Sequence, residues 1–168
     1  GHGTHVAGIV HSICPHCSLM PLKVLDYFGG DDYTIARGIL YAQEQGAKLL
    51  IVACNTAAAA ALSELQEHFD IPVVGVIEPG VRSMAAATRN GRVGVIGTVG
   101  TIESGAYQTA VAAEAPWVDL CALSCPGFVE FVERGEFRSH QVHVLAERLL
   151  APAIDAGIDT LLLGCTHY

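Results

Sequence analysis

The sequence predicts an α/β protein in which a parallel β-sheet is flanked by helices. Apolar runs without polar alternation recur along the chain, and such runs are typical of strands buried on both faces of a sheet. Segments of helical composition separate these runs, and alternating strands and helices indicate parallel pairing. The clearest example is residues 49–57, LLIVACNTA, where an apolar strand leads into an alanine-rich helix.

The first half of the chain contains three predicted strands and four predicted helices. Gly46 is expected to end a helix, because glycine favours helix C-termini. Thr56 can cap the helix after it, and Pro79 suits the first position of another. The helices are predicted at 1–12, 33–45, 57–68 and 79–89, and the strands at 19–25, 48–53 and 71–77.

The second half repeats the alternation. Asn90 and Gly91 form a turn signal, and we place the boundary between two domains there, giving residues 1–91 and 92–168. A loop is expected over GTVGT, residues 97–101. The remaining strands are predicted at 92–97, 118–123 and 158–163, and the remaining helices at 103–114, 127–134 and 139–156.

The amino-acid composition and net charge of the chain limit the kinds of molecule that it is expected to bind. The chain has 168 residues, of which 51% are hydrophobic, so it can fill a sizeable core. A net charge of −8 argues against nucleic acid or an anionic membrane as a partner. No apolar run approaches the roughly 20 residues that span a bilayer. Six scattered cysteines suit a reducing compartment, so a cytoplasmic location is predicted.

Two cysteines follow predicted strands directly. Cys54 lies between an apolar strand and a helix, and Cys165 follows the apolar run of residues 158–163. Ligands of open α/β sheets bind at this edge, and a helix N-terminus favours a thiolate. The alternative is two unrelated packing residues, because free cysteine is among the most buried residue types.

Two thiols facing one pocket could invert a carbon centre without a cofactor. Inversion at the α-carbon of an amino acid needs a base on one face and an acid on the other. Two cysteines can exchange these roles, because each can be thiol or thiolate. The segments CNTA, GTVGT and GCTH supply hydroxyls and backbone N–H groups for the substrate carboxylate.

Residues 47–168 resemble glutamate racemases, within the wider aspartate/glutamate racemase group. The resemblance implies two Rossmann-like α/β lobes, here truncated at the C-terminus, and a cofactor-independent isomerase acting on glutamate. The resemblance implies an enzyme without a metal ion, and it is compatible with a homodimer. It is carried by the segments GAKLLIVACNTAAAAAL, FDIPVVGVIEPGVR, GRVGVIGTVGTIESGAYQ, SCPGFVEFVERGE and DAGIDTLLLGCTHY.

The resemblance also implies roles for single residues. Cys54 and Cys165 would be the catalytic acid/base thiols, with His167 assisting the second. Glu133 would support the site from a neighbouring helix, although a solvated glutamate is the simpler interpretation. Substrate contacts would come from Asn55, Thr56, Thr98, Thr101 and Thr166.

Two parts of the family pattern are absent, which keeps other functions open. The family has an Asp-Ser-Gly segment and a Pro-Tyr-Gly segment that contact substrate, and neither tripeptide occurs in this sequence. One alternative is therefore a catalytically inert scaffold that keeps the outline of the site. Another is a protein that binds a small anion through the N–H groups of CNTA and GTVGT but catalyses no reaction.

Residues 1–48 resemble a different family. GHGTHVAGIV is similar to the catalytic-histidine segment of subtilisin-like serine proteases, in which His2 would be the base. No Gly-Thr-Ser nucleophile segment occurs, so a protease fragment without its serine and aspartate is expected to be inactive. Because both families have a helix, a turn and a buried strand near residues 46–49, we interpret the chain as a chimera joined there, with 49–91 completing the first lobe.

Cys14-Pro15-His16-Cys17 forms a CxxC motif. Thiol–disulfide enzymes place this motif after a strand at a helix N-terminus, whereas here it follows a predicted helix. A zinc site would need a second pair of ligands at suitable spacing. A surface loop with an opportunistic disulfide is therefore the prediction.

Overall fold

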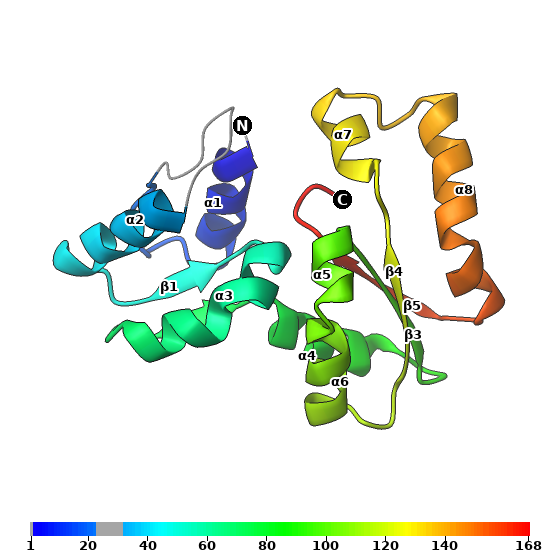
Figure 1. Ribbon diagram of the computed structural model, residues 1–168, viewed down its shortest axis with the longest axis horizontal. Coiled ribbons are helices and arrows are strands. Elements are labelled where there is room, and N and C mark those ends of the chain that lie inside the picture. Colours follow the sequence, from blue (N-terminus) through cyan, green and yellow to red (C-terminus); the bar gives the residue numbers. More distant parts are fainter. Residues whose placement is uncertain (1, 23–31) are drawn as a thin grey trace. The chain divides into compact units, whose positions relative to one another are not determined.

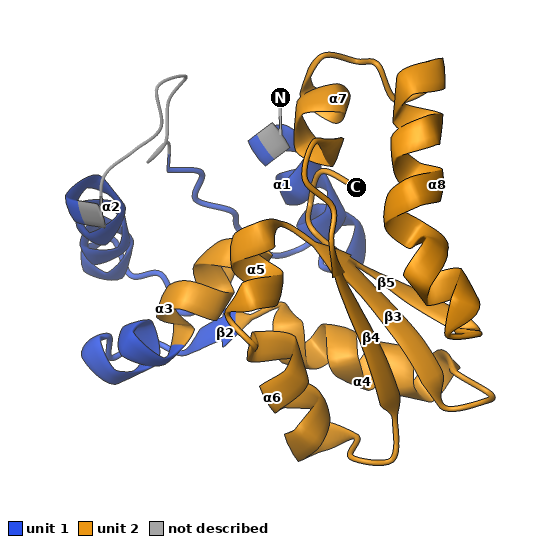
Figure 2. Ribbon diagram, turned by 45° about the vertical axis from the view of Figure 1, so that its right-hand side comes forward, with its two compact units in different colours: residues 1–51, 63–74 blue, residues 52–62, 75–168 orange. Residues whose placement is uncertain are grey.

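The computed structural model describes residues 2–22 and 32–168, and Figure 1 shows their helices and strands. By its internal contacts the chain divides into two compact units. Unit 1 comprises residues 1–51 and 63–74, and unit 2 comprises residues 52–62 and 75–168 (Figure 2). The two-domain division at residue 91 stays a prediction.

Unit 1 contains two helices and part of a third. Helix α1 covers His2–Ile13, α2 covers Asp32–Glu44, and α3 covers Asn55–His68. The C-terminus of α2 follows the sequence prediction, because Gly46 has a φ of +80°, and its N–H bonds the Gln43 carbonyl at 2.9 Å. Glycine adopts this left-handed conformation without the steric cost of a Cβ atom.

A short sheet of two strands joins β1, Leu50–Val52, to β2, Val73–Gly75. Both strands are shorter than predicted: residues 48, 49 and 53 form no strand, and neither do residues 71, 72, 76 and 77, of which Ile77 begins α4. The Leu50 N–H donates to the Pro72 carbonyl at 2.9 Å just ahead of β2. Cys54 and the first turn of α3 follow β1 in the chain.

Unit 2 is built on a parallel sheet with the strand order β4-β3-β5. The central strand β3, Arg92–Gly97, pairs with β4, Asp119–Ser124, on one side and with β5, Thr160–Gly164, on the other. Val93 and Val95 of β3 are fully buried, as the apolar run RVGVIG predicts for a central strand. The α/β fold class with parallel strands is therefore confirmed.

Helices cover both faces of this sheet. Helices α4, Ile77–Ala87, and α6, Ala106–Glu114, pack against each other on one face, and α8, His140–Asp155, lies on the opposite face against β4 (Figure 2). Two short helices, α5, Val99–Glu103, and α7, Phe128–Glu133, follow β3 and β4. The core between sheet and helices is formed by Val81, Met84, Val93, Val95, Tyr107, Val111 and Val118.

Several predicted boundaries are wrong. The GTVGT segment is not a loop: α5 begins within it, because the Thr98 hydroxyl caps the helix by accepting the Thr101 N–H at 3.2 Å. Helix α3 starts at Asn55, so Thr56 lies inside its first turn. Helix α4 begins two residues before Pro79, which a first-turn proline tolerates.

The predicted strand at 19–25 is not found in its described part. Residues 19–22 form no helix or strand, and residues 23–25 lie outside the described residues. The sequence also predicts a turn over 27–32, of which residues 27–31 lie outside the described residues and Asp32 begins α2. Within the described residues, no helix is both long enough and apolar enough to cross a membrane.

The turn that joins α4 to β3 is held by one carboxylate. Asp159 accepts hydrogen bonds from the Thr88 hydroxyl at 2.6 Å, from the Arg89 N–H at 2.7 Å and from the Asn90 N–H at 2.9 Å. Chiefly through the Thr88 hydrogen bond, these contacts lower the pKa of Asp159 to about 2. Asp159 immediately precedes β5, so these hydrogen bonds connect the turn after α4 to the start of β5.

Candidate functional site

Both strand-end cysteines belong to unit 2. Cys54 is an exposed free thiol between β1 and α3, and its carbonyl accepts the Ala58 N–H in the first turn of that helix. Cys165 is a half-buried free thiol directly after β5. Burial raises the pKa of Cys165, and the charge of Cys54 raises it further. The Cys54 thiol therefore lies close enough to Cys165 to act on its pKa.

A turn at the C-terminus brings an imidazole to the Cys165 thiol. The Tyr168 N–H donates to the Cys165 carbonyl at 3.2 Å, which folds residues 165–168 back on themselves. His167 Nδ1 then lies 3.7 Å from Cys165 Sγ, and a backbone hydrogen bond from His167 opposes the rise in the Cys165 pKa. Thr166 is half-buried in the same turn.

Glu133 contacts the other nitrogen of this imidazole. Its Oε1 lies 2.9 Å from His167 Nε2, although the glutamate side chain remains 61% exposed at the end of α7. The simpler interpretation of Glu133, as a solvated helix residue, is therefore incomplete. With Nε2–H directed to the carboxylate, His167 Nδ1 is left as the acceptor that faces Cys165.

Three threonine hydroxyls form a triangle. Thr56 Oγ1, Thr98 Oγ1 and Thr101 Oγ1 lie 2.9 Å from one another, joining the first turn of α3 to the start of α5. Thr101 is fully buried, whereas Thr56 is exposed. Each hydroxyl carries one proton and two acceptor lone pairs, so the cluster can turn a donor outward to an anion.

Asn55 is held by a residue that sequence reasoning missed. Asn55 is buried, with 8% of its surface exposed, and its Oδ1 accepts the Tyr107 hydroxyl at 2.7 Å. Burial, together with the charge of Cys165, raises the Tyr107 pKa to about 12. Tyr107 resembles any core aromatic in the sequence, and its partner lies 52 residues away, so no local pattern marks it.

Comparison with known proteins decides the family. Residues 30–168 match the family described as Asp/Glu/Hydantoin racemase. The chain belongs to this family. The racemase part of the sequence resemblance is therefore confirmed, whereas nothing in the comparisons supports the subtilisin-like segment or the chimera.

Individual racemases agree with this assignment. A glutamate racemase from Corynebacterium kroppenstedtii is 56% identical over 124 residues, which cover 74% of this chain and 43% of the relative. A solved glutamate racemase from Bacillus anthracis superposes with a TM-score of 0.85 at 35% identity, covering 99% of this chain and 65% of that one. The chain thus spans less than half the length of this curated relative.

A third similar structure contains a bound ligand. The glutamate racemase from Francisella tularensis was solved in complex with D-glutamate, and it superposes on this family member with a TM-score of 0.80 at 31% identity. The match covers 99% of this chain and 65% of that one.

The other predicted candidates, His2, Cys14 and Cys17, belong to unit 1. His2 is the first residue of α1, and its side chain lies outside the described residues. Cys14 and Cys17 form a disulfide in a turn after α1. Among the described residues, no group of three or more His, Cys, Asp or Glu side chains could hold a metal ion.

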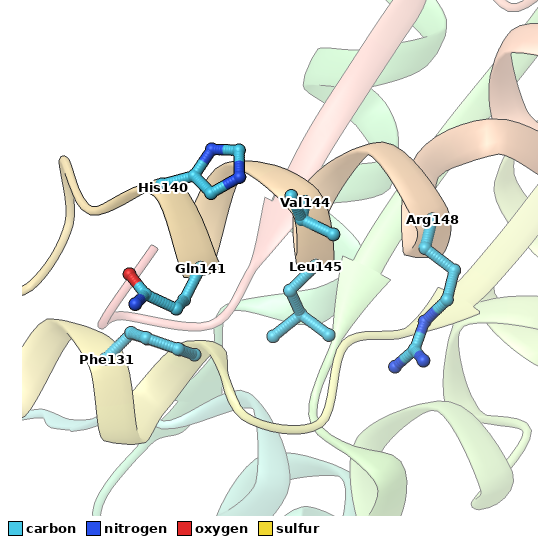
Figure 3. Close-up of a pocket in the computed structure, with 6 residues that line it drawn as sticks. All are labelled: Phe131, His140, Gln141, Val144, Leu145 and Arg148. Atoms are coloured by element: carbon cyan, nitrogen blue, oxygen red, sulfur yellow. The ribbon is translucent and has the colours of Figure 1, made fainter.

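A groove of about 480 Å³ lies between α7 and α8 (Figure 3). Phe131 and Leu145 face into it from the two helices, and Arg148 lies at one end. None of the predicted site residues lines this groove. It therefore provides no support for a second substrate site.

Proposed function

We propose that this chain carries the two-thiol proton-transfer site of a cofactor-independent glutamate racemase. The observation that supports it most is the pair Cys54 and Cys165, which follow β1 and β5 and belong to one unit, where the charge of Cys54 raises the pKa of Cys165. Membership of the racemase family makes glutamate the substrate to test first. The D-glutamate complex of the Francisella tularensis relative agrees with this choice.

The proposed reaction moves one proton at each face of the α-carbon. One cysteine, as the thiolate, takes the α-proton and becomes a thiol, which leaves a carbanion on the substrate. The other cysteine gives its proton to the opposite face and becomes a thiolate. The two protonation states are thereby exchanged, so the enzyme is ready to run the reaction in reverse.

His167 and Glu133 would serve the second thiol. Burial holds the Cys165 pKa up, which disfavours the thiolate. The His167 Nδ1 atom can accept the thiol proton, and the Glu133 carboxylate stabilises the imidazolium that results. This chain of contacts offsets the cost of forming a thiolate in a half-buried position.

The substrate carboxylate would be held by polar groups of α3 and α5. Asn55 and the hydroxyls of Thr56, Thr98 and Thr101 lie at the N-termini of these helices, where N–H groups and the helix dipole favour an anion. Thr166 would add a contact from the turn after β5. These roles follow the resemblance residue by residue.

The test is deuterium incorporation at the α-carbon of L- and D-glutamate in deuterated water. Since each enantiomer presents its α-proton to a different cysteine, Cys54→Ser and Cys165→Ser should both abolish racemisation. Each variant should retain residual deuterium exchange with only one enantiomer of glutamate. The enantiomer that still exchanges should differ between the two variants. Cys121→Ser, which changes a half-buried free thiol of β4, is the matched control and should keep full exchange.

Other outcomes would favour the remaining interpretations. Saturable glutamate binding without exchange would favour an anion-binding protein, and neither binding nor exchange would favour an inert scaffold. Casein hydrolysis that depends on His2 would favour the subtilisin-like interpretation of residues 1–48, which stays a prediction together with the chimera. A homodimer and a cytoplasmic location also stay predictions.

A further inference from the structure

Tyr107 is a polar side chain inside the core of unit 2. It is the second residue of α6, and only 1% of its surface is exposed. Its ring belongs to the apolar cluster that contains Val93 and Val95, so packing fixes its position. Its hydroxyl emerges from that cluster and donates to Asn55 Oδ1 at 2.7 Å.

This hydrogen bond decides which way the Asn55 amide faces. The oxygen and nitrogen of an asparagine amide have nearly the same shape, so packing alone does not separate the two orientations. Because a pKa of about 12 keeps Tyr107 protonated at neutral pH, its hydroxyl remains able to donate to Oδ1. The Nδ2 atom and its two N–H donors are thereby turned to the other side of the amide.

The same hydroxyl lies beside the second cysteine segment. A Cβ atom placed on Gly164 would lie 3.1 Å from Tyr107 Oη and 2.8 Å from the Ile96 carbonyl oxygen. The absence of a side chain at Gly164 therefore leaves room for the hydroxyl. One phenol thus contacts the residue after Cys54 and closely approaches the residue before Cys165.

We propose that Tyr107 is a positioning residue, which orients the Asn55 amide so that its N–H groups, and not its oxygen, are presented to the substrate carboxylate. The inference rests on the proposed function in one respect, namely that the carboxylate belongs to glutamate. The orientation itself is a property of the free protein. It can therefore be measured without substrate.

The sequence allows a selective test, because it contains only two asparagines, Asn55 and Asn90. Protein labelled with ¹⁵N-asparagine should show two side-chain amide pairs by NMR. Tyr107→Phe should shift the Asn55 pair and leave the Asn90 pair unchanged, since Asn90 Nδ2 donates to the Gly157 carbonyl at 3.0 Å. Glutamate affinity should fall by about two- to tenfold, the range expected for one hydrogen bond.

Two further variants separate orientation from folding. Tyr168→Phe removes a hydroxyl that donates to the Cys125 carbonyl at 3.2 Å, so it should leave the Asn55 pair unchanged. Asn55→Asp keeps an acceptor for Tyr107 but has no N–H to offer, so it should lower glutamate affinity more than Tyr107→Phe does. Asn55→Asp therefore tests the role of the Asn55 N–H groups without a change at Tyr107, should Tyr107→Phe unfold.

The proposal is overturned if Tyr107→Phe is folded and the Asn55 pair keeps its chemical shifts. It is equally overturned if the pair shifts while glutamate affinity stays the same. Wild-type protein that neither binds glutamate nor exchanges deuterium would contradict the proposed function. The carboxylate role of Asn55 would then fall with it, whereas the amide spectrum would still decide whether Tyr107 orients Asn55.

Discussion

At the scale of single residues, the sequence marks the two candidate thiols more clearly than the groups that contact them. Cys54 and Cys165 can be proposed from the sequence because each follows an apolar run directly. Glu133 and Tyr107 meet their partners across 34 and 52 residues of sequence. Such contacts depend on how helices pack, and no local pattern in the sequence encodes them.

The contact between Glu133 and His167 gives the first residue-scale prediction. Glu133→Gln removes a carboxylate that lies 2.9 Å from His167 Nε2, so under the proposed function Cys165 should form its thiolate at higher pH. We expect the pH profile of deuterium exchange to shift to more alkaline values and the rate at neutral pH to fall by roughly tenfold, which corresponds to one pKa unit.

Glu136→Gln is the matched control for this prediction. It removes a carboxylate that lies 3.5 Å from Arg134 Nε, three residues further along the chain than Glu133. The control should keep the wild-type pH profile. An unchanged profile in Glu133→Gln would contradict the assigned role of Glu133.

At the scale of helices and strands, element type was predictable and element ends were less so. The apolar run RVGVIG predicts β3 because a central strand is buried on both faces. The segment GTVGT reads as a loop because it holds two glycines, yet the Thr98 cap is sufficient to start α5 there. Capping depends on side-chain geometry, which the residue types alone leave open.

The turn held by Asp159 gives a prediction at this scale. The pKa of Asp159 is lowered, so its contacts stabilise the fold above the unfolded-state pKa of about 4, and this stabilisation is lost as the pH falls towards 2. Asp159→Asn should therefore lower the unfolding temperature by a few degrees at pH 7. The difference from wild type should shrink as the pH falls from 5 to 2.

Thermal unfolding followed by circular dichroism at several pH values measures this difference. Asp155→Asn makes the same change of charge at the last residue of α8, and it should show a smaller effect at pH 7. A difference between Asp159→Asn and wild type that stays constant with pH would contradict the role of the Asp159 charge.

At the scale of the whole molecule, the composition predicted a core-forming α/β chain, and the comparisons confirm its family. The interpretation of residues 1–48 rested on a short motif, HGTHVAG. A short motif carries less information than the five segments spread over residues 47–168. The solved Bacillus anthracis racemase superposes on 99% of the chain, which includes this front part.

The six cysteines allow a prediction for the molecule as a whole. Cys14 and Cys17 form a disulfide, and Cys54, Cys121, Cys125 and Cys165 are free. Titration with a coloured disulfide reagent should find four thiols in the unfolded, unreduced protein and six after reduction. In the folded protein Cys54 should react first, because it is exposed, and Cys125 last, because it is buried.

Glutamate should slow the labelling of Cys54 if this thiol faces the substrate. Labelling of the folded protein in the presence and absence of glutamate, followed by mass spectrometry of the peptides, measures this protection. Six thiols without reduction would contradict the disulfide, and equal rates with and without glutamate would argue against a substrate site at Cys54.

The pairing of Gly97 with Gly164 has a consequence for how this chain can evolve. Thr98 and Cys165 each follow one member of this pair, so the register of two neighbouring strands sets where the proposed carboxylate-binding hydroxyl and the proposed second thiol begin. An insertion or deletion of one residue within β5 would turn every later side chain to the opposite face. Changes of length should therefore be tolerated better in the turn before Asp159 than within β5, where they would misplace Cys165.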